Sequence, residues 1–201
     1  MARYYLLAAA LNVWVLVLIL AAAFGVQLIA GEPPCPLCVV QRIALMLCAL
    51  GPLYTLLQAR DGALTCRHVA IGNGISVISA LVGAAASTRQ VLLHILPGDP
   101  GFGSPLLGLH LYTWCLIAFI CQIAASGLML IGAAWLKEER VPWRITNITA
   151  GAFVVMVAAN LLSVIAEAGF NWDLPSNPVE YLLFKSLVDG LFGTDVGPIS
   201  S

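Results

Sequence analysis

The chain turns at EPPCPLCVVQR, residues 32–42, where a proline-rich connection between two long apolar segments becomes the start of a helix. Cys35 and Cys38 stand two residues apart at that start, in the spacing of a pair that can close a small disulfide ring. A helix N-terminus stabilises a thiolate and lowers the pKa of a cysteine placed there. Arg42 follows Cys38 by four residues and therefore lies on the same helical face, one turn deeper. The pattern predicts a redox-active dithiol above a cation; a structural disulfide or half of a zinc site is the alternative.

The composition identifies the class of protein. Hydrophobic residues make up 61% of the 201 residues and charged residues 9%, with a mean hydropathy of +0.96. Soluble domains carry roughly 25% charged and about 45–50% apolar residues, so we expect an integral membrane protein. The first apolar run is longer than the ~7–15 residues of a signal-peptide core and has no cleavage site, so we expect it to remain as a helix. A net charge of −1 gives no reason to expect nucleic acid as a partner.

Several uncharged stretches approach or exceed the about 20 residues that span a bilayer. They are Tyr4–Gly31, Ile43–Ala59 (continuing outward to Cys38), Val69–Thr88, a part of Pro100–Leu136, and Ile145–Ala166. The sequence therefore predicts an all-α, polytopic membrane bundle: a four-helix domain over residues 1–140, a fifth transmembrane helix over 141–168, and an outer tail over 169–201. Within that tail, the Asn-Pro-Val-Glu start at 177–180 and apolar residues at helical spacing predict an amphipathic helix on the membrane surface.

The charges predict the orientation of the bundle. Cytoplasmic connections are enriched in lysine and arginine. With the N-terminus inside, the inner side receives six of the nine Lys and Arg residues, and the outer side receives seven of the ten acids, Glu167 among them. The inner six are Arg3, Arg60, Arg67, Lys137, Arg140 and Arg144. We therefore expect a cytoplasmic N-terminus, an outer C-terminus and, in a bacterial inner membrane, a cysteine pair on the oxidising periplasmic side.

Further polar residues near the depth of Cys38 are candidates for binding. Arg42, about one turn below the surface, either extends outward as a lipid anchor or binds a polar headgroup and steadies the Cys38 thiolate. Arg89, Gln90 and His94 lie at the outer end of the third span, and His94 and His110 close the two ends of a glycine- and proline-rich loop. The two histidines could ligate a haem or hydrogen-bond a quinone; the alternative is two interfacial residues bonded to loop carbonyls. No metal site is predicted.

The remaining cysteines fit no second redox pair. Cys48 lies about 15 Å below Cys38 at ~1.5 Å per residue, so we expect a core residue. Cys66 faces the cytoplasm in the predicted orientation, where thiols stay reduced. Cys115 and Cys121 are six residues apart and do not share a helical face.

The motif Pro34-Cys35-Pro36-Leu37-Cys38, followed by Arg42 at the outer start of the second span, resembles the bacterial disulfide bond formation protein B (DsbB) family. The resemblance covers roughly Tyr4 to Leu136. It implies a quinone-dependent thiol:disulfide oxidoreductase whose Cys35–Cys38 disulfide is kept oxidised by ubiquinone or menaquinone. It also implies that the quinone binds beside the pair near Arg42, with residues at the outer end of the third span, Arg89 and His94, contributing.

The same resemblance implies a reaction sequence. A periplasmic, thioredoxin-like partner of the DsbA type attacks Cys35, which we expect to be the more exposed sulfur, and the displaced Cys38 thiolate is left against the quinone. Cys35 then restores the disulfide as quinol forms. The electrons pass to the respiratory chain.

Two features depart from that family. Its second, outer-loop cysteine pair has no counterpart here, because residues 95–109 and the outer tail contain no cysteine. The fifth span and the tail also exceed the family's four-helix plan. Either the partner reacts directly with Cys35–Cys38 or a second protein supplies the missing pair. The alternative functions are a non-enzymatic quinone- or haem-binding subunit of a larger membrane complex, and a reductase in which electrons flow toward the thiol partner.

Overall fold

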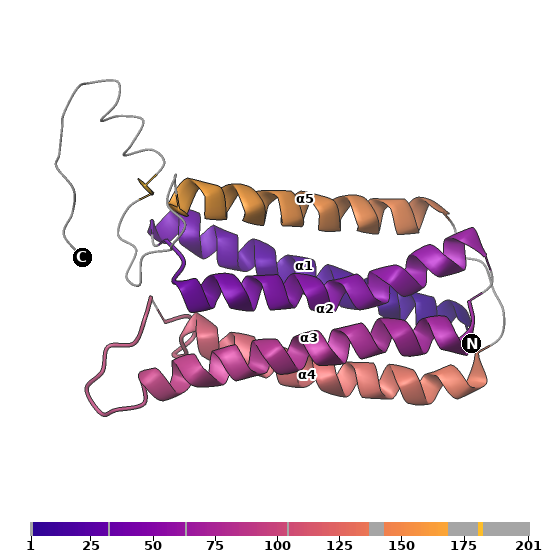
Figure 1. The fold of residues 1–201 in the computed structure, drawn as a ribbon, viewed down its shortest axis with the longest axis horizontal. Coiled ribbons are helices and arrows are strands. Elements are labelled where there is room, and N and C mark those ends of the chain that lie inside the picture. The colour runs from indigo at the N-terminus through magenta and orange to yellow at the C-terminus, as the bar shows by residue number, and fades with distance from the viewer. Residues whose placement is uncertain are drawn as a thin grey trace, which may run out of the picture.

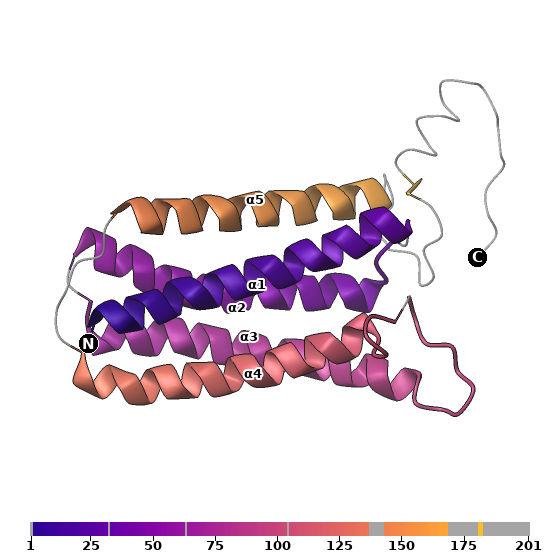
Figure 2. The ribbon, with the colours of Figure 1, turned by 180° about the vertical axis from the view of Figure 1, so that it is seen from behind.

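A computed structural model of the chain describes residues 2–31, 33–62, 64–103, 105–136, 143–168 and 181–182. Within these residues the structure has five long helices, which lie side by side (Figures 1 and 2). They are α1 (Ala2–Ala30), α2 (Pro36–Asp61), α3 (Cys66–Leu93), α4 (Leu111–Gly132) and α5 (Trp143–Ala168), and a 3-10 turn, η1 (Ala133–Trp135), follows α4.

All five helices are long and apolar enough to cross a membrane, which confirms the prediction of an all-α, multi-pass membrane protein. The predicted amphipathic helix of the tail lies outside the described residues, apart from Tyr181 and Leu182. The domain boundaries at 140 and 168 stay predictions.

The start of α2 explains how the cysteine pair is placed. Cys35 is the N-cap, with an extended backbone, and its sulfur accepts a hydrogen bond from the Cys38 amide at 3.2 Å. Pro36 occupies the first helical position, where the missing N–H costs nothing because it would have no partner in the helix. The helix thus begins at Pro36. The sequence predicted a start near Cys38, two residues later. In consequence Cys38 lies in the first turn of α2, and Cys35 faces it from the cap.

A proline inside α2 ties this helix to α3. Pro52 has no N–H to give to the carbonyl four residues earlier, that of Cys48. The Ser76 hydroxyl of α3 donates a hydrogen bond to that carbonyl at 2.7 Å. The two helices approach closely at this level: a Cβ atom added to Gly72 would lie 2.6 Å from the Gly51 carbonyl oxygen. Cys48 is fully buried here, as expected of a core residue.

The fifth helix packs against α1 and α2, on the side away from α3 and α4 (Figure 1). Polar contacts bind it at three levels. Asn147 accepts from Arg60 at 2.9 Å, Thr149 accepts from the Trp14 indole at 3.2 Å, and Ser163 accepts from Gln27 at 2.9 Å. Hydrogen bonds between apolar helices specify which faces meet. The last of these contacts lies at the end of the bundle that carries Cys35, hereafter the cysteine end.

Candidate functional site

The two thiols of the motif occupy different surroundings. Cys35 is buried, with 6% of its surface exposed, whereas Cys38 is half-buried. The expectation that Cys35 is the more exposed sulfur is therefore wrong, because this sulfur is enclosed as the cap of α2 and as an acceptor from α3. Its hydrogen bond with the Cys38 side chain, followed by burial, raises the pKa of the Cys35 thiol well above its usual range.

Gln90 of α3 holds both sulfurs. Its amide nitrogen lies 3.3 Å from the Cys35 sulfur and 3.7 Å from the Cys38 sulfur. Its amide oxygen accepts from Gln41 at 2.8 Å, which fixes the orientation of the Gln90 amide toward the pair. The sequence placed Gln90 near the depth of Cys38 but gave neither glutamine a role. A donor aimed at two sulfurs stabilises whichever of them carries negative charge.

Arg42 is held inside the bundle by α1. Its guanidinium donates to the Gln27 amide oxygen at 2.6 Å and to the Ala23 carbonyl at 3.4 Å, and its central carbon lies 4.8 Å from the centre of the Phe24 ring. Only 7% of the residue is exposed. These contacts direct the cation into the protein, in contrast to the outward course of a lipid anchor.

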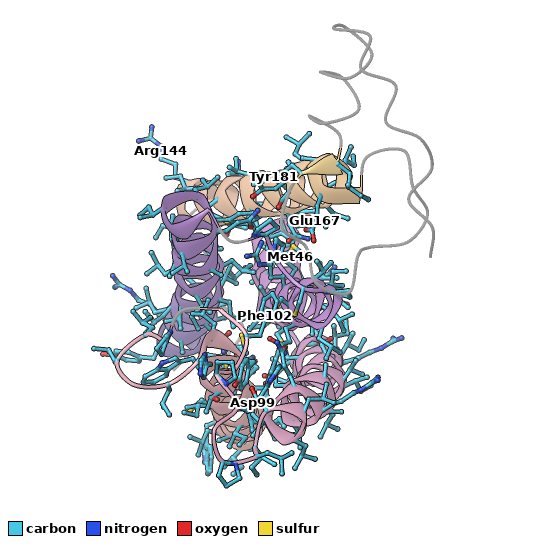
Figure 3. The ribbon with its side chains drawn as sticks, turned by 90° about the vertical axis from the view of Figure 1, so that its left-hand side faces the viewer. Met46, Asp99, Phe102, Arg144, Glu167 and Tyr181 are labelled. Carbon is cyan, nitrogen blue, oxygen red and sulfur yellow. The ribbon has the colours of Figure 1, made fainter. Side chains whose placement is uncertain are left out.

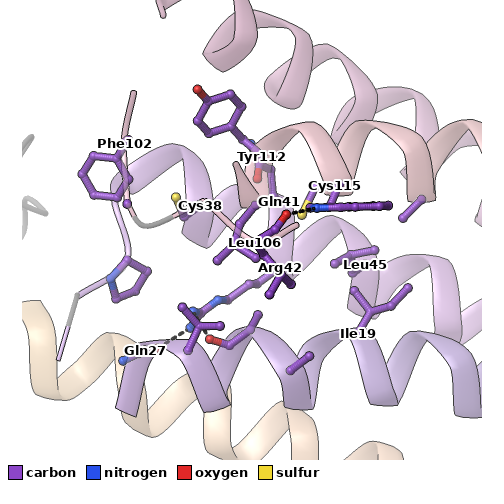
Figure 4. A pocket seen from close by; sticks show the side chains of 18 of the residues that line it. Ile19, Gln27, Cys38, Gln41, Arg42, Leu45, Phe102, Leu106, Tyr112 and Cys115 are labelled. Atoms are coloured by element: carbon purple, nitrogen blue, oxygen red, sulfur yellow. Dashed lines mark hydrogen bonds between the residues drawn. The ribbon is translucent and has the colours of Figure 1, made fainter. Parts of the chain in front are cut away.

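Cys38 and Arg42 open onto one cavity of about 430 Å³. The cavity lies between α1, α2, α4 and the loop before α4, and Figure 4 shows Arg42 and Gln27 meeting at it. Most of its lining is apolar, including Ile19 and Leu45 at depth. Sites for small organic ligands typically measure about 300–1,000 Å³ and combine apolar walls with a few placed polar groups. This cavity fits an apolar ligand that carries a hydrogen-bond acceptor for Arg42 and presents a reactive face to Cys38.

The other predicted binding residues lie outside the lining of that cavity. His94 pairs with Asp99 at 3.0 Å, and His110 lies 3.1 Å from the Gly103 carbonyl oxygen. The Gly101 amide, followed by His94, lowers the pKa of the Asp99 carboxyl. Both imidazoles stack on Tyr112, which does line the cavity. Arg89 is exposed on α3. The histidines therefore brace one wall, and cofactor binding by these three residues stays a prediction.

Two polar residues that the sequence did not single out are buried at this end of the bundle. Gln27, which the hydropathy pattern places in a plain apolar helix, joins Arg42 to α5 and also donates to the Tyr181 hydroxyl at 2.8 Å. Glu167 of α5, counted in the sequence among the outer acids, is buried, and Figure 3 shows it near Tyr181 at the cysteine end. The sequence could have indicated both residues, because polar residues within membrane spans are rare and usually functional.

Membrane-length helices and a cysteine pair whose second member lines an apolar cavity define the class: a multi-pass membrane protein with a paired-cysteine site. The chain matches the family model "Disulfide bond formation protein DsbB" over residues 5–104. The chain belongs to the DsbB family. No solved structure matches it.

Named relatives agree with this assignment. Disulfide bond formation protein B 2 of Burkholderia lata is 31% identical over 139 residues, covering 54% of this chain and 79% of the relative. Disulfide bond formation protein B of Chromobacterium violaceum is 40% identical over 83 residues, 39% of this chain and 48% of the relative. Disulfide bond formation protein B 1 of Pseudomonas savastanoi is 27% identical over 156 residues, 62% of this chain and 86% of the relative. The family model covers Cys35, Cys38, Arg42 and Gln90 and ends before α4 and α5.

Proposed function

We propose that the protein is a quinone-dependent thiol:disulfide oxidoreductase of a bacterial inner membrane. It oxidises the thiols of a periplasmic, DsbA-like partner at Cys35–Cys38 and passes the electrons to ubiquinone or menaquinone. The observation that carries the proposal is that Cys38 and Arg42 line the same apolar cavity. Membership of the DsbB family supports the thiol–disulfide half of the reaction.

The two cysteines have different roles in the proposed reaction, one toward the electron acceptor and the other toward the thiol partner. A bound quinone supplies an acceptor for two electrons and two protons. Cys38 lines the cavity and Cys35 does not, so Cys38 serves the acceptor side and Cys35 receives the partner's thiolate. Because Cys35 is buried, the partner has to displace part of its cover to reach this sulfur. Arg42 binds and orients an acceptor oxygen through a charge-assisted hydrogen bond. Gln90 holds both sulfurs within reach of each other as the disulfide opens and closes.

The cysteine content constrains the partner reaction. Residues 95–109 contain no cysteine that could relay a disulfide. We propose that the partner's cysteine exchanges directly with the Cys35–Cys38 disulfide. The Cys38→Ala variant leaves Cys35 free and should therefore accumulate a mixed disulfide between Cys35 and a thioredoxin-like protein.

A thiol-trapping titration tests the proposed function. The purified full chain is reduced in detergent without oxygen, ubiquinone is added, and the remaining thiols are alkylated and mapped. We expect two thiols to disappear, both at Cys35 and Cys38, and the Cys48→Ala control to behave as the unsubstituted protein does. If both thiols persist while quinone binds, the protein is an accessory quinone-binding subunit and the oxidoreductase proposal fails.

A further inference from the structure

A carboxyl group in the last turn of α5 is buried and has no hydrogen-bond partner among the described residues. Glu167 is fully buried, and neither of its carboxylate oxygens has a hydrogen-bond partner in the described part of the chain. Hydrogen bonds through Gln27 connect its helix to Arg42, and Arg42 and Cys38 are the charged groups that act on it. A carboxyl group enclosed in a membrane protein is costly unless it is neutral or paired with a cation. Its charge therefore depends on what Arg42 and Cys38 carry.

Gln27 connects the helix of Glu167 to Arg42. The Gln27 amide oxygen accepts from Arg42, and the amide nitrogen donates to Ser163. Ser163 lies four residues before Glu167, so both side chains belong to one face of α5. That face is thus directed toward Gln27, whose amide oxygen binds the guanidinium. Because the family model ends at residue 104, it does not include this contribution of α5.

The ionisable groups around Glu167 allow the charge to be counted in each redox state. Arg42 and Cys38 of α2 act on it directly, while Cys115 of α4 and Tyr181 act on Arg42. In the oxidised state the disulfide is neutral, so Arg42 favours an ionised Glu167. In the reduced state a thiolate on Cys38 would offset the charge of Arg42 and repel a second negative charge. Glu167 then carries a proton, and the cluster has no net charge in either state.

Building on the proposed function, we propose that Glu167 binds a proton when the Cys35–Cys38 pair is reduced and releases it when the pair is oxidised. The fifth helix thereby supplies the proton-transfer group of the site. The balance closes: reduction opens the S–S bond with two electrons and two protons, one proton on Cys35 and one on Glu167, with Cys38 left as the thiolate. Oxidation re-forms the S–S bond, and the two electrons and two protons pass to the acceptor.

Infrared difference spectroscopy of the full-length protein tests this assignment. The pair is reduced with a dithiol and reoxidised with ferricyanide, so that the measurement does not depend on quinone. We expect the reduced-minus-oxidised spectrum to contain a positive C=O stretching band of a protonated carboxylic acid. The band should vanish in Glu167→Gln and persist in Asp61→Asn, a matched carboxylate-to-amide change at an exposed position at the opposite end of the bundle. Absence of the band in the unsubstituted protein, or its persistence in Glu167→Gln, overturns the proposal.

If Glu167→Gln does not fold, the Glu167→Asp variant still tests the assignment. Counting the protons released on oxidation provides an independent measurement. Glu167→Asp retains an ionisable carboxyl group and should shift the band without abolishing it; an unshifted band would assign it to another residue and overturn the proposal. At a pH where Cys38 is the thiolate, ferricyanide oxidation should release two protons per disulfide in the unsubstituted protein and one in Glu167→Gln. Failure of ubiquinone to oxidise the pair would refute the proposed function but leave both readouts intact, so the two failures are distinguishable.

Discussion

Three glutamines fix the reactive groups of the site. Gln27 holds Arg42, Gln41 orients Gln90, and Gln90 donates to both sulfurs. An amide offers donors and an acceptor together without a charge, so it can bind a cation on one side and a hydroxyl or sulfur on the other. Inside an apolar bundle this avoids the cost of burying further ions.

Removing the Gln90 amide should slow the chemistry of the pair. Hydrogen bonds to charged groups are worth about 1.5–3 kcal/mol, so we expect Gln90→Leu to slow reaction of the reduced pair with ubiquinone by about 10- to 100-fold. Stopped-flow mixing of the reduced protein with quinone measures this rate. Gln58→Leu is the matched control, because Gln58 lies near the far end of α2. Equal rates for the two variants would show that the contacts of Gln90 with the sulfurs are incidental.

Arg42 is predicted to act mainly on binding. Arg42→Ala removes the one cation that lines the cavity among the described residues. We expect the KM for ubiquinone to rise by about tenfold or more, the equivalent of one hydrogen bond to a charged donor, with a smaller effect on kcat. Steady-state kinetics over a range of quinone concentrations separates the two parameters. Arg67→Ala, an exposed cation at the start of α3, should leave the KM unchanged; a KM that is also unchanged in Arg42→Ala would make Arg42 a structural residue.

At this scale the sequence predicted only the residues that lie close together in the chain. The placement of Cys35, Cys38 and Arg42 follows from a four-residue helical spacing and a proline-induced turn. Gln27, Gln90 and Glu167 come from three other helices, and their meeting depends on how each helix is rotated about its axis. Spans that are apolar on every side give little periodic signal from which to read that rotation.

Among the helices, the α2–α3 contact depends on the absence of side chains. A Cβ atom on Gly51 would collide with the Gly72 carbonyl and the Ser76 hydroxyl, whereas one on Gly74 would meet no atom. We expect Gly51→Ala to lower the free energy of unfolding by about 1–3 kcal/mol, as overpacking does. Gly74→Ala should be neutral or stabilising by up to about 1 kcal/mol, because alanine favours the helix. Thermal unfolding in detergent compares the stability of the two variants. Equal stability would show that α2 and α3 do not approach closely at Gly51.

The helices themselves were predictable, and their ends less so. Hydropathy located all five spans, but it placed the third at Val69–Thr88, whereas α3 runs from Cys66 to Leu93. The difference arises because hydropathy stops at polar residues, while a helix stops where its backbone loses its partners. Thr65 caps α3 with His68 in a reciprocal capping box, so the helix begins among polar residues.

For the whole molecule, the odd number of described spans places the start of α1 and the end of α5 at opposite ends of the bundle (Figure 1). The distribution of lysine and arginine predicts which end is cytoplasmic. Cys66 and Ile95 flank α3, and both are exposed. A membrane-impermeant maleimide added to spheroplasts should label an Ile95→Cys variant that lacks the other cysteines.

The matched control retains Cys66 as its only cysteine and should react only after the membrane is permeabilised. The reverse labelling pattern would show that the bundle has the opposite orientation, with Cys35 and Cys38 on the side of the reducing cytoplasm. The proposed oxidation of a periplasmic partner would then fail with it.

The hydrogen bond from Ser76 to the Cys48 carbonyl, which replaces the one that Pro52 cannot make, has a consequence for biogenesis. Before α3 packs against α2, the Cys48 carbonyl has no hydrogen-bond donor in its own helix and would lie in lipid without a partner. A nascent chain that ends after α2 therefore carries a defect that only the next helix repairs. We expect α2 and α3 to leave the insertion machinery as a hairpin, which brings Gln90 beside the cysteines while the rest of the protein is still being synthesised.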